Sequence, residues 1–447
     1  MSPGLNDPYS TGALRGRVLD AWAASPARFR EDANAEEDYA LGGYRDRVVL
    51  ELAQNAADAA ARARVPGRLR LTLRDGTLTA SNTGAPLDAA GVEALSTLRA
   101  SSKRDHAGPG DAGDATVGRF GVGFAAVVAV SDSPRIHSAA GAVGWSRERT
   151  GLLVAGVPTL VDELEARGGH VPVLRLPFAD DGRPADGFVT SVELPLRDRA
   201  AVALVARLLA EAGPALLLAL PALADIEIET DAGTRALTAA RAAGVVTITV
   251  GGTVSRWRVA ADGGVLEPAL LADRPAEERA RTAWSVRWAV PVDGASDGAS
   301  NGGPVALPVD GVSAVVHAPT PTDEPLGLPA LLLASFPLSP DRRHVAPGPL
   351  TDFLVERAAD VYAGMLPAFA PGPGLLELVP GPVGRGELDA RLARAIVSRL
   401  PTVAFLPAAD AGAARIRPRD AVLLAGGTPA LAQWLAPVLP SLVDGPT

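Results

Sequence analysis

The feature that most constrains this chain is an uninterrupted helical segment near its N-terminus, at residues 44–63. The sequence YRDRVVLELAQNAADAAARA contains no glycine or proline, and its apolar residues recur with helical periodicity. Glu51, Asn55 and Asp58 are spaced i, i+4 and i+7, which places them within an arc of about 60° on the helix. We expect the residues around this polar stripe to be buried, namely Val49, Leu52, Ala53, Ala56 and Ala60. The stripe then faces either solvent or a pocket. A solvated face is the usual case for an isolated motif of this kind.

The segments around this helix predict an α+β fold. Residues 13–40 are predicted to be helical, with Trp22 and Phe29 as apolar anchors. Two alternating strands are expected at 69–73 and 77–81, joined at Asp75-Gly76, a dipeptide typical of a type I′ hairpin. A short helix at 88–97 and strands near 135–155 and 188–196 complete a mixed β-sheet with its helices on one face.

The second half of the chain predicts further domains, because 447 residues exceed one ordinary core. Strands are expected at 225–229, 245–250 and 255–260, a flexible loop at 291–304, further α/β elements at 311–319 and 328–338, and a helix at 350–366. We predict a first domain at 1–199, a middle-like α/β domain at 200–370 and a small C-terminal α/β segment at 371–447.

Composition excludes several classes of function. A net charge of −9 disfavours a nucleic-acid binder that works by neutralising phosphates, and the absence of cysteine excludes thiolate zinc sites, disulfides and thiol catalysis. The N-terminus lacks an apolar signal core, and the apolar run Pro214 to Ala224 is interrupted by Pro221. We therefore expect a cytoplasmic protein with no membrane contact and no nucleic-acid partner.

A glycine-rich motif, GRFGVGF at 118–124, precedes a predicted apolar helix. Gly118, Gly121 and Gly123 free the backbone to turn its N–H groups toward an anion, although a plain tight turn uses the same residues. No Gly-Lys-Ser/Thr follows, so the motif is not a Walker loop, and it does not match the dinucleotide fingerprint.

Four motifs together resemble the GHKL (Bergerat-fold) ATPase superfamily, in the branch of the ninety-kilodalton heat-shock chaperones and sacsin. They are ELAQNAAD (51–58), SNTGAPL (81–87), GRFGVGFAAVVAVSD (118–132) and the strand GFVTSVELPL that contains Thr190. SSKR (101–104) is similar to the nucleotide-binding repeats of sacsin. The resemblance covers residues 40–198 and implies a Bergerat-fold sandwich, with ATP and Mg²⁺ as cofactors.

The resemblance also implies a role for each matching residue. Glu51 is the expected general base, with a pKa raised by burial, and Asn55 is the expected Mg²⁺ ligand. Asp58 and Thr190 are expected on the sugar and adenine side, and Gly84 lets the base approach the backbone. The expected phosphate-binding residues are Lys103, Gly118, Gly121, Val122, Gly123 and Phe124.

Asn82 departs from the family pattern, which usually has an aspartate that accepts a hydrogen bond from the adenine amino group. An amide oxygen can accept the same bond without charge, so we expect a weaker contact. The alternative for Asn82 is an ordinary turn residue.

The segment LGLPALLLASFPLSPDRRHV (326–345) resembles a sacsin segment that ends in a double arginine. In heat-shock chaperones a basic residue of the middle domain reaches the γ-phosphate, so Arg342 or Arg343 is expected to stabilise charge in the transition state. A surface loop with a solvated arginine pair is the alternative.

The predicted function is that of an ATP-binding, Mg²⁺-dependent ATPase that acts as a chaperone-like conformational switch. The alternative is a non-catalytic, nucleotide-gated scaffold in a signalling or defence assembly. A histidine kinase is disfavoured because no histidine-bearing helix precedes residue 51, and topoisomerase or mismatch-repair roles are disfavoured by the acidic charge. Expected partners are ATP and ADP, a protein client, and a second copy of the chain in an ATP-dependent dimer.

Overall fold

The computed structural model describes residues 7–41, 45–96, 123–280, 282–293, 303–304, 312, 314–318, 320–339, 341, 343–370, 373–409, 415–424 and 428–443. These residues divide into two compact units, with the boundary between Ala239 and Ala240. No helix in the described part of the chain combines the length and apolarity needed to cross a bilayer.

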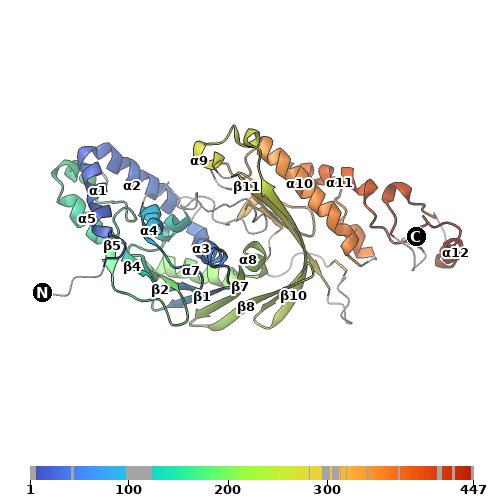
Figure 1. Ribbon diagram of the computed structural model, residues 1–447, viewed down its shortest axis with the longest axis horizontal. Helices are drawn as coiled ribbons and strands as arrows, with labels where there is room; N and C mark the ends of the chain where they lie inside the picture. The colour runs from blue at the N-terminus through green and yellow to red at the C-terminus, as the bar shows by residue number, and fades with distance from the viewer. Residues whose placement is uncertain are drawn as a thin grey trace. The chain divides into compact units, whose positions relative to one another are not determined.

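The described residues of the first unit form eight α-helices, several 3₁₀-helices and a sheet, coloured blue to green in Figure 1. Its helices are α1 (Thr11–Ala24), α2 (Pro26–Leu41), α3 (Val48–Ala63), α4 (Ala89–Ser96), α5 (Arg147–Ala155), α6 (Val161–Ala166), α7 (Arg199–Glu211) and α8 (Pro214–Ala219). Its strands are β1 (Gly67–Arg74), β2 (Thr77–Asn82), β3 (Arg135–Ser138), β4 (Gly141–Gly144), β5 (Phe178–Asp180), β6 (Thr190–Pro195), β7 (Leu223–Thr230) and β8 (Gly233–Ala242), the last of which crosses the boundary.

The sheet of the first unit is mixed, in the order β8-β7-β1-β2-β6-β3-β4-β5. β1 and β7 run parallel, whereas the other paired neighbours in this unit run antiparallel. Helices and a mixed sheet together confirm the coarse prediction of an α+β architecture. β7 lies beyond residue 199, yet it belongs to the sheet of the first unit.

The predicted hairpin is confirmed at Asp75-Gly76. Both residues have positive φ, 48° and 68°, as a type I′ turn requires. Alternate residues of β1, Leu69, Leu71 and Leu73, are buried, and α3 contacts this strand. The period-2 pattern of β1 therefore identified its core-facing side correctly.

Two sequence predictions in this unit are wrong in part. The strand expected to extend to residue 155 ends at Gly144, and α5 follows because Ser146 caps it by accepting a hydrogen bond from Arg149 N (3.2 Å). The apolar helix expected after the glycine-rich motif is a 3₁₀-helix, η3 (Gly123–Ala129). Its hydrogen bonds close tighter turns than those of an α-helix, and its seven residues exceed the usual length of a 3₁₀-helix.

α1 and α2 lie side by side in Figure 1 and share an aromatic contact. The rings of Trp22 and Phe29 meet edge to face with centroids 5.2 Å apart, and both side chains are fully buried. The indole N–H of Trp22 donates to Asp32. The two predicted apolar anchors are confirmed.

Glu36 on α2 is a buried carboxylate that ties the helix to a loop. It accepts hydrogen bonds from the backbone N–H groups of Val173 (2.5 Å) and Leu174 (3.0 Å). Burial raises its pKa from 4.5 to about 7, although these two amides and Arg175 favour the charged form. Glu36 is therefore a titrating group near neutral pH.

The raised pKa of Glu36 makes the stability of the chain depend on pH. Since the folded chain holds this proton more tightly than the unfolded chain, its contribution is fully present below pH 4.5 and is lost as the pH rises through about 7. As the pH rises through this window, the free energy of unfolding of wild type should therefore fall by about 2 to 3 kcal/mol relative to that of Glu36→Gln. Urea unfolding of both proteins as a function of pH measures it; parallel curves would contradict the assigned pKa.

The second unit contains a six-stranded mixed sheet in the order β9-β10-β11-β14-β12-β13. These strands are β9 (Val245–Val250), β10 (Thr253–Val265), β11 (Ala283–Val292), β12 (Val315–His317), β13 (Pro321–Pro325) and β14 (Leu331–Ala334). Its helices are α9 (Ala276–Arg279), α10 (Pro349–Met365), α11 (Glu387–Arg399) and α12 (Pro429–Leu435). α10 covers β10 and β11, where the rings of Trp288 and Tyr362 lie 4.7 Å apart.

The first α-helix of the predicted C-terminal α/β segment is α11, which packs against α10 (Figure 1). After α11 the β structure of the described residues consists only of isolated bridges, such as Leu406 with Ile416, and one further α-helix, α12, follows. The β part of that prediction is therefore limited to single bridges.

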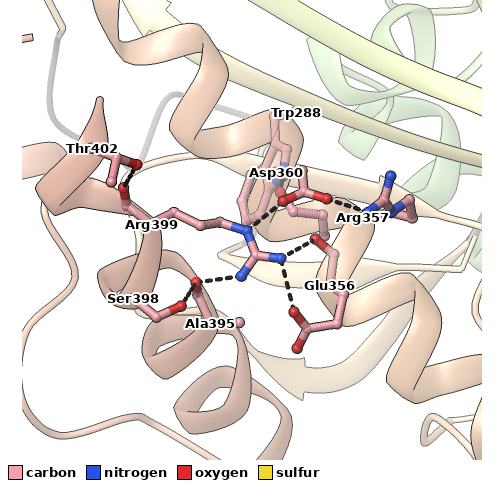
Figure 2. Close-up of polar contacts among 9 residues, drawn as sticks. Trp288, Glu356, Arg357, Asp360, Ala395, Ser398, Arg399 and Thr402 are labelled. Carbon is pink, nitrogen blue, oxygen red and sulfur yellow. Dashed lines mark hydrogen bonds and ion pairs between the residues drawn. The ribbon is translucent and has the colours of Figure 1, made fainter. Parts of the chain in front are cut away.

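One arginine joins α11 to α10, as Figure 2 shows. Arg399 Nε donates to Asp360 Oδ1 (2.5 Å), Nη2 to Glu356 Oε2 (2.8 Å) and Nη1 to the carbonyl oxygen of Ala395 (2.7 Å). Asp360 also pairs with Arg357. These partners hold the guanidinium in one geometry, which makes the ion pairs stronger than mobile surface pairs.

Arg399→Met keeps the side-chain length and removes every polar contact of this group. We expect it to lower the free energy of unfolding by about 1 to 2 kcal/mol, because the network is partly exposed. Arg394→Met is the matched control, since Arg394 is exposed on the same helix, and it should change stability by less than about 0.5 kcal/mol. Equal effects in chemical unfolding would show that the network contributes nothing.

Candidate functional site

The polar stripe of α3 is the first part of the candidate site. Glu51 and Asn55 are half-buried, and Asp58 is only 2% exposed. The five apolar neighbours predicted to be buried are all buried, which confirms that prediction: Val49, Leu52, Ala53, Ala56 and Ala60. A stripe whose last carboxylate is buried does not lie on a freely solvated helix face.

The loop after β2 lies directly on α3. Gly84 has φ +119°, and a Cβ atom placed on it would stand 2.5 Å from the carbonyl carbon of Ala59. The next residue, Ala85, donates its N–H to the carbonyl oxygen of Ala59 (2.9 Å). Gly84 is therefore required both by its backbone conformation and by the close approach of loop and helix.

Three polar side chains form a row across β2, β6 and β3. Asn82 pairs with Thr190, and Thr190 pairs with Ser138 in the strand register. The hydroxyl oxygens of Thr190 and Ser138 lie 3.3 Å apart, and all three residues are buried. The register places this row on the same face of the sheet as Leu69, which is the face that α3 covers.

The amide of Asn82 has a defined orientation. Its Nδ2 donates to the carbonyl oxygen of Thr83 (2.9 Å). Since an amide side chain has one donor end and one acceptor end, Oδ1 is the atom that remains to accept a hydrogen bond. Among the described residues, no partner occupies Oδ1.

Ser138 was not predicted from the sequence. Its Oγ accepts from Leu87 N (3.0 Å), and the hydroxyl of Tyr9 donates to the carbonyl oxygen of Leu87 (3.1 Å). The only signal that could find Ser138 is the antiparallel register of β3 with β6, which joins residues far apart in the chain.

The segment after the glycine-rich motif contacts both α3 and α2. Gly123 begins η3, and Phe124 is buried with its ring 5.5 Å from that of Trp145. The remaining predicted phosphate-binding residues lie outside the described residues: Lys103, Gly118, Gly121 and Val122.

Arg342 also lies outside the described residues, and Arg343 belongs to the second unit. Arg343 is exposed and pairs with Asp323 (3.6 Å). Asp341 holds the same loop by accepting from the backbone N–H groups of Arg343 and His344. The hydrogen bond with the His344 ring lowers the pKa of Asp341 to about 2 and raises the pKa of His344. The arginine loop is thus ordered by carboxylates, while its predicted contact with a γ-phosphate stays a prediction.

The described residues do not bring together three or more histidine, aspartate or glutamate side chains that could hold a metal ion. This pattern is compatible with magnesium, because proteins usually hold it through one or two side chains together with substrate phosphates. Asn55 offers one such oxygen, half-buried and one helical turn from Glu51.

Comparison of the sequence with models of known protein families gives no match, and comparison with curated proteins gives none either. The chemistry of the site therefore rests on its own residues.

Proposed function

We propose that the first unit binds ATP with Mg²⁺ and hydrolyses it, as a Bergerat-fold ATPase of the heat-shock and sacsin kind. The observation that carries the proposal is the arrangement around Asn82. Oδ1 of Asn82 is oriented to accept from an exocyclic amino group, the Thr190 hydroxyl lies beside it, and Gly84 brings the backbone close to α3. Adenine needs an acceptor for its amino group and a close, flat approach.

The stripe of α3 supplies the remaining groups in this proposal. Asp58 binds the sugar and adenine side, Asn55 contributes an oxygen to Mg²⁺, and Glu51 orients water and takes its proton. Magnesium neutralises phosphate charge when bound. The residues keep one order along the helix, with the base nearest its N-terminus and the buried Asp58 nearest Gly84.

The conformational switch, the contribution of Arg342 or Arg343, a protein client and ATP-dependent self-association extend the proposal beyond the first unit. Ordering of segments by a γ-phosphate is a common switching device. A nucleotide-gated scaffold without turnover uses the same binding residues, and Glu51 distinguishes the two functions.

Binding is tested by thermal unfolding with and without Mg-ATP. A ligand at a hundred times its dissociation constant should stabilise the chain by about 2.7 kcal/mol. Asn82→Leu and Thr190→Val should reduce the shift, because each removes one polar contact proposed for adenine. Thr79→Val is the control, since Thr79 lies on β2 three positions from Asn82 and therefore on the opposite face of the sheet. Absence of any shift in wild type would refute the proposed function.

A further inference from the structure

A second candidate site lies in the first unit, away from the stripe of α3. It is a partly open recess of about 130 Å³ between α2, η3, the start of α5 and residues 167–171. Its polar lining residues are Glu36, Glu37, Arg147, Arg167, His170 and Arg197. None of the groups proposed for ATP lines it.

Three arginine side chains contribute to the wall of this recess. Arg147 Nε (2.7 Å) and Arg197 Nη2 (2.8 Å) both pair with the same oxygen of Asp132, so two guanidinium groups share one carboxylate. Arg167 pairs with Glu37 and donates to Asn34. Three arginines therefore face two paired carboxylates and Glu36, so the excess is one positive charge when Glu36 is protonated and none when it is ionised.

Two arginines at this wall have unused hydrogen-bonding capacity. Arg167 Nε is buried and has no hydrogen-bond partner within the described ranges. The same residues provide no hydrogen bond to the terminal nitrogens of Arg147, whose Nε alone is engaged. The parallel N–H groups of a guanidinium match the two oxygens of a carboxylate. A bound carboxylate therefore neutralises positive charge and accepts hydrogen bonds from the unused donors.

The rest of the lining is apolar and limits the size of the ligand. Ala33, Ala40, Val128 and Val171 contribute only carbon atoms from their side chains. A cavity of roughly 150 Å³ takes up a molecule of the size of benzene, so the recess fits a ligand of similar size. A nucleotide is far too large for it.

We propose that this recess is a binding site for a small organic carboxylate with a short hydrocarbon part. The carboxylate group contacts the terminal nitrogens of Arg147, and the hydrocarbon part lies against the alanine and valine side chains.

Glu36 couples this site to protons. Glu36 is one of the lining residues and titrates near neutral pH, so a bound anion favours its protonated form. The charged or titratable groups that surround it are Asp32 and Glu37 of α2, Asp132, Arg147, Arg167, His170, Arg175 and Arg197. Binding should therefore take up a proton and tighten as the pH falls.

Titration calorimetry with sodium butyrate tests the proposal, and butanamide serves as the uncharged probe of the same shape. Butyrate should bind and butanamide should bind at least about tenfold more weakly, because only butyrate engages the guanidinium charge. Arg147→Met should weaken butyrate binding by at least about tenfold. Arg149→Met should leave it unchanged, because that guanidinium lies over the ring of Phe178 instead (3.8 Å).

Ala40→Leu fills the recess without altering a charge and should also abolish binding. This variant still tests the recess if Arg147→Met fails to fold. Wild type should bind butyrate up to about tenfold more tightly at pH 6 than at pH 8, and Glu36→Gln should lose this dependence although His170 remains. The proposal is wrong if butyrate does not bind, if butanamide binds equally well, or if the two arginine variants behave alike. None of these outcomes depends on ATP, so failure here is separate from failure of the ATPase proposal.

Discussion

Replacing Glu51 with alanine should lower the rate of ATP hydrolysis by about 100-fold or more while leaving Mg-ATP binding nearly unchanged. A general base contributes about this much to catalysis, and its removal leaves the groups proposed for adenine and Mg²⁺ in place. Steady-state ATPase activity gives the rate, and the Mg-ATP thermal shift reports binding in the same preparation. A fall in kcat without a matching fall in affinity is the signature of a group that acts mainly in the transition state.

Two variants sharpen the test of Glu51. Glu51→Gln keeps the shape of the side chain and one hydrogen-bonding oxygen. Because an amide cannot accept a proton, this variant should still lose most of the activity. Glu165→Ala removes an exposed carboxylate from α6 in the same unit and should have wild-type activity. If wild type binds Mg-ATP and turns it over no faster than Glu51→Ala, the chain is a nucleotide-gated scaffold, and the catalytic assignment is wrong.

Gly84→Ala should lower the free energy of unfolding by about 2 to 5 kcal/mol. Two costs add in this variant. Alanine is strained at φ +119°, and its Cβ would lie 2.5 to 2.6 Å from backbone atoms of Ala59 and Ala60, which cannot move without disturbing α3. Because the added methyl group displaces the loop from α3, Mg-ATP should also raise the melting temperature of this variant by less than that of wild type.

Gly187→Ala separates the two costs. Gly187 also has positive φ, +82°, but an added Cβ meets no atom within 4 Å. It should therefore show only the cost of the backbone conformation, about 1 to 2 kcal/mol. Urea unfolding of both variants measures the difference, fitted with separate transitions for the two units if they appear. Equal losses would show that the approach of the loop to α3 tolerates a methyl group.

The parts of the fold predicted best from the sequence are those specified by local periodicity. The helical spacing of α3 identified its five buried apolar residues, and Asp75-Gly76 identified the hairpin. Each signal is contained within a short segment of the sequence. The prediction also placed Trp22 and Phe29 in the core. Local chemistry is sufficient for each of these features.

The features that the sequence did not reveal depend on contacts between distant segments. Ser138 joins the buried row through the pairing of β3 with β6, and Glu36 is held by hydrogen bonds from residues 173 and 174, more than 130 positions away. The change from strand to helix after Gly144 turns on one capping residue, Ser146. Neither strand register nor the burial of a charged residue on a polar helix follows from local periodicity.

The parallel pairing of β1 with β7 has a consequence for how the chain folds while it is being synthesised. Thr72 and Glu229 are neighbours in the sheet but lie 157 positions apart in the sequence. At ordinary elongation rates, β7 follows β1 from the ribosome after about 10 to 30 s. Until then one edge of β1 has no partner, and unpaired edges recruit other strands. A nascent chain that stops at residue 199 should therefore need protection against aggregation, which is relieved once residue 230 has emerged.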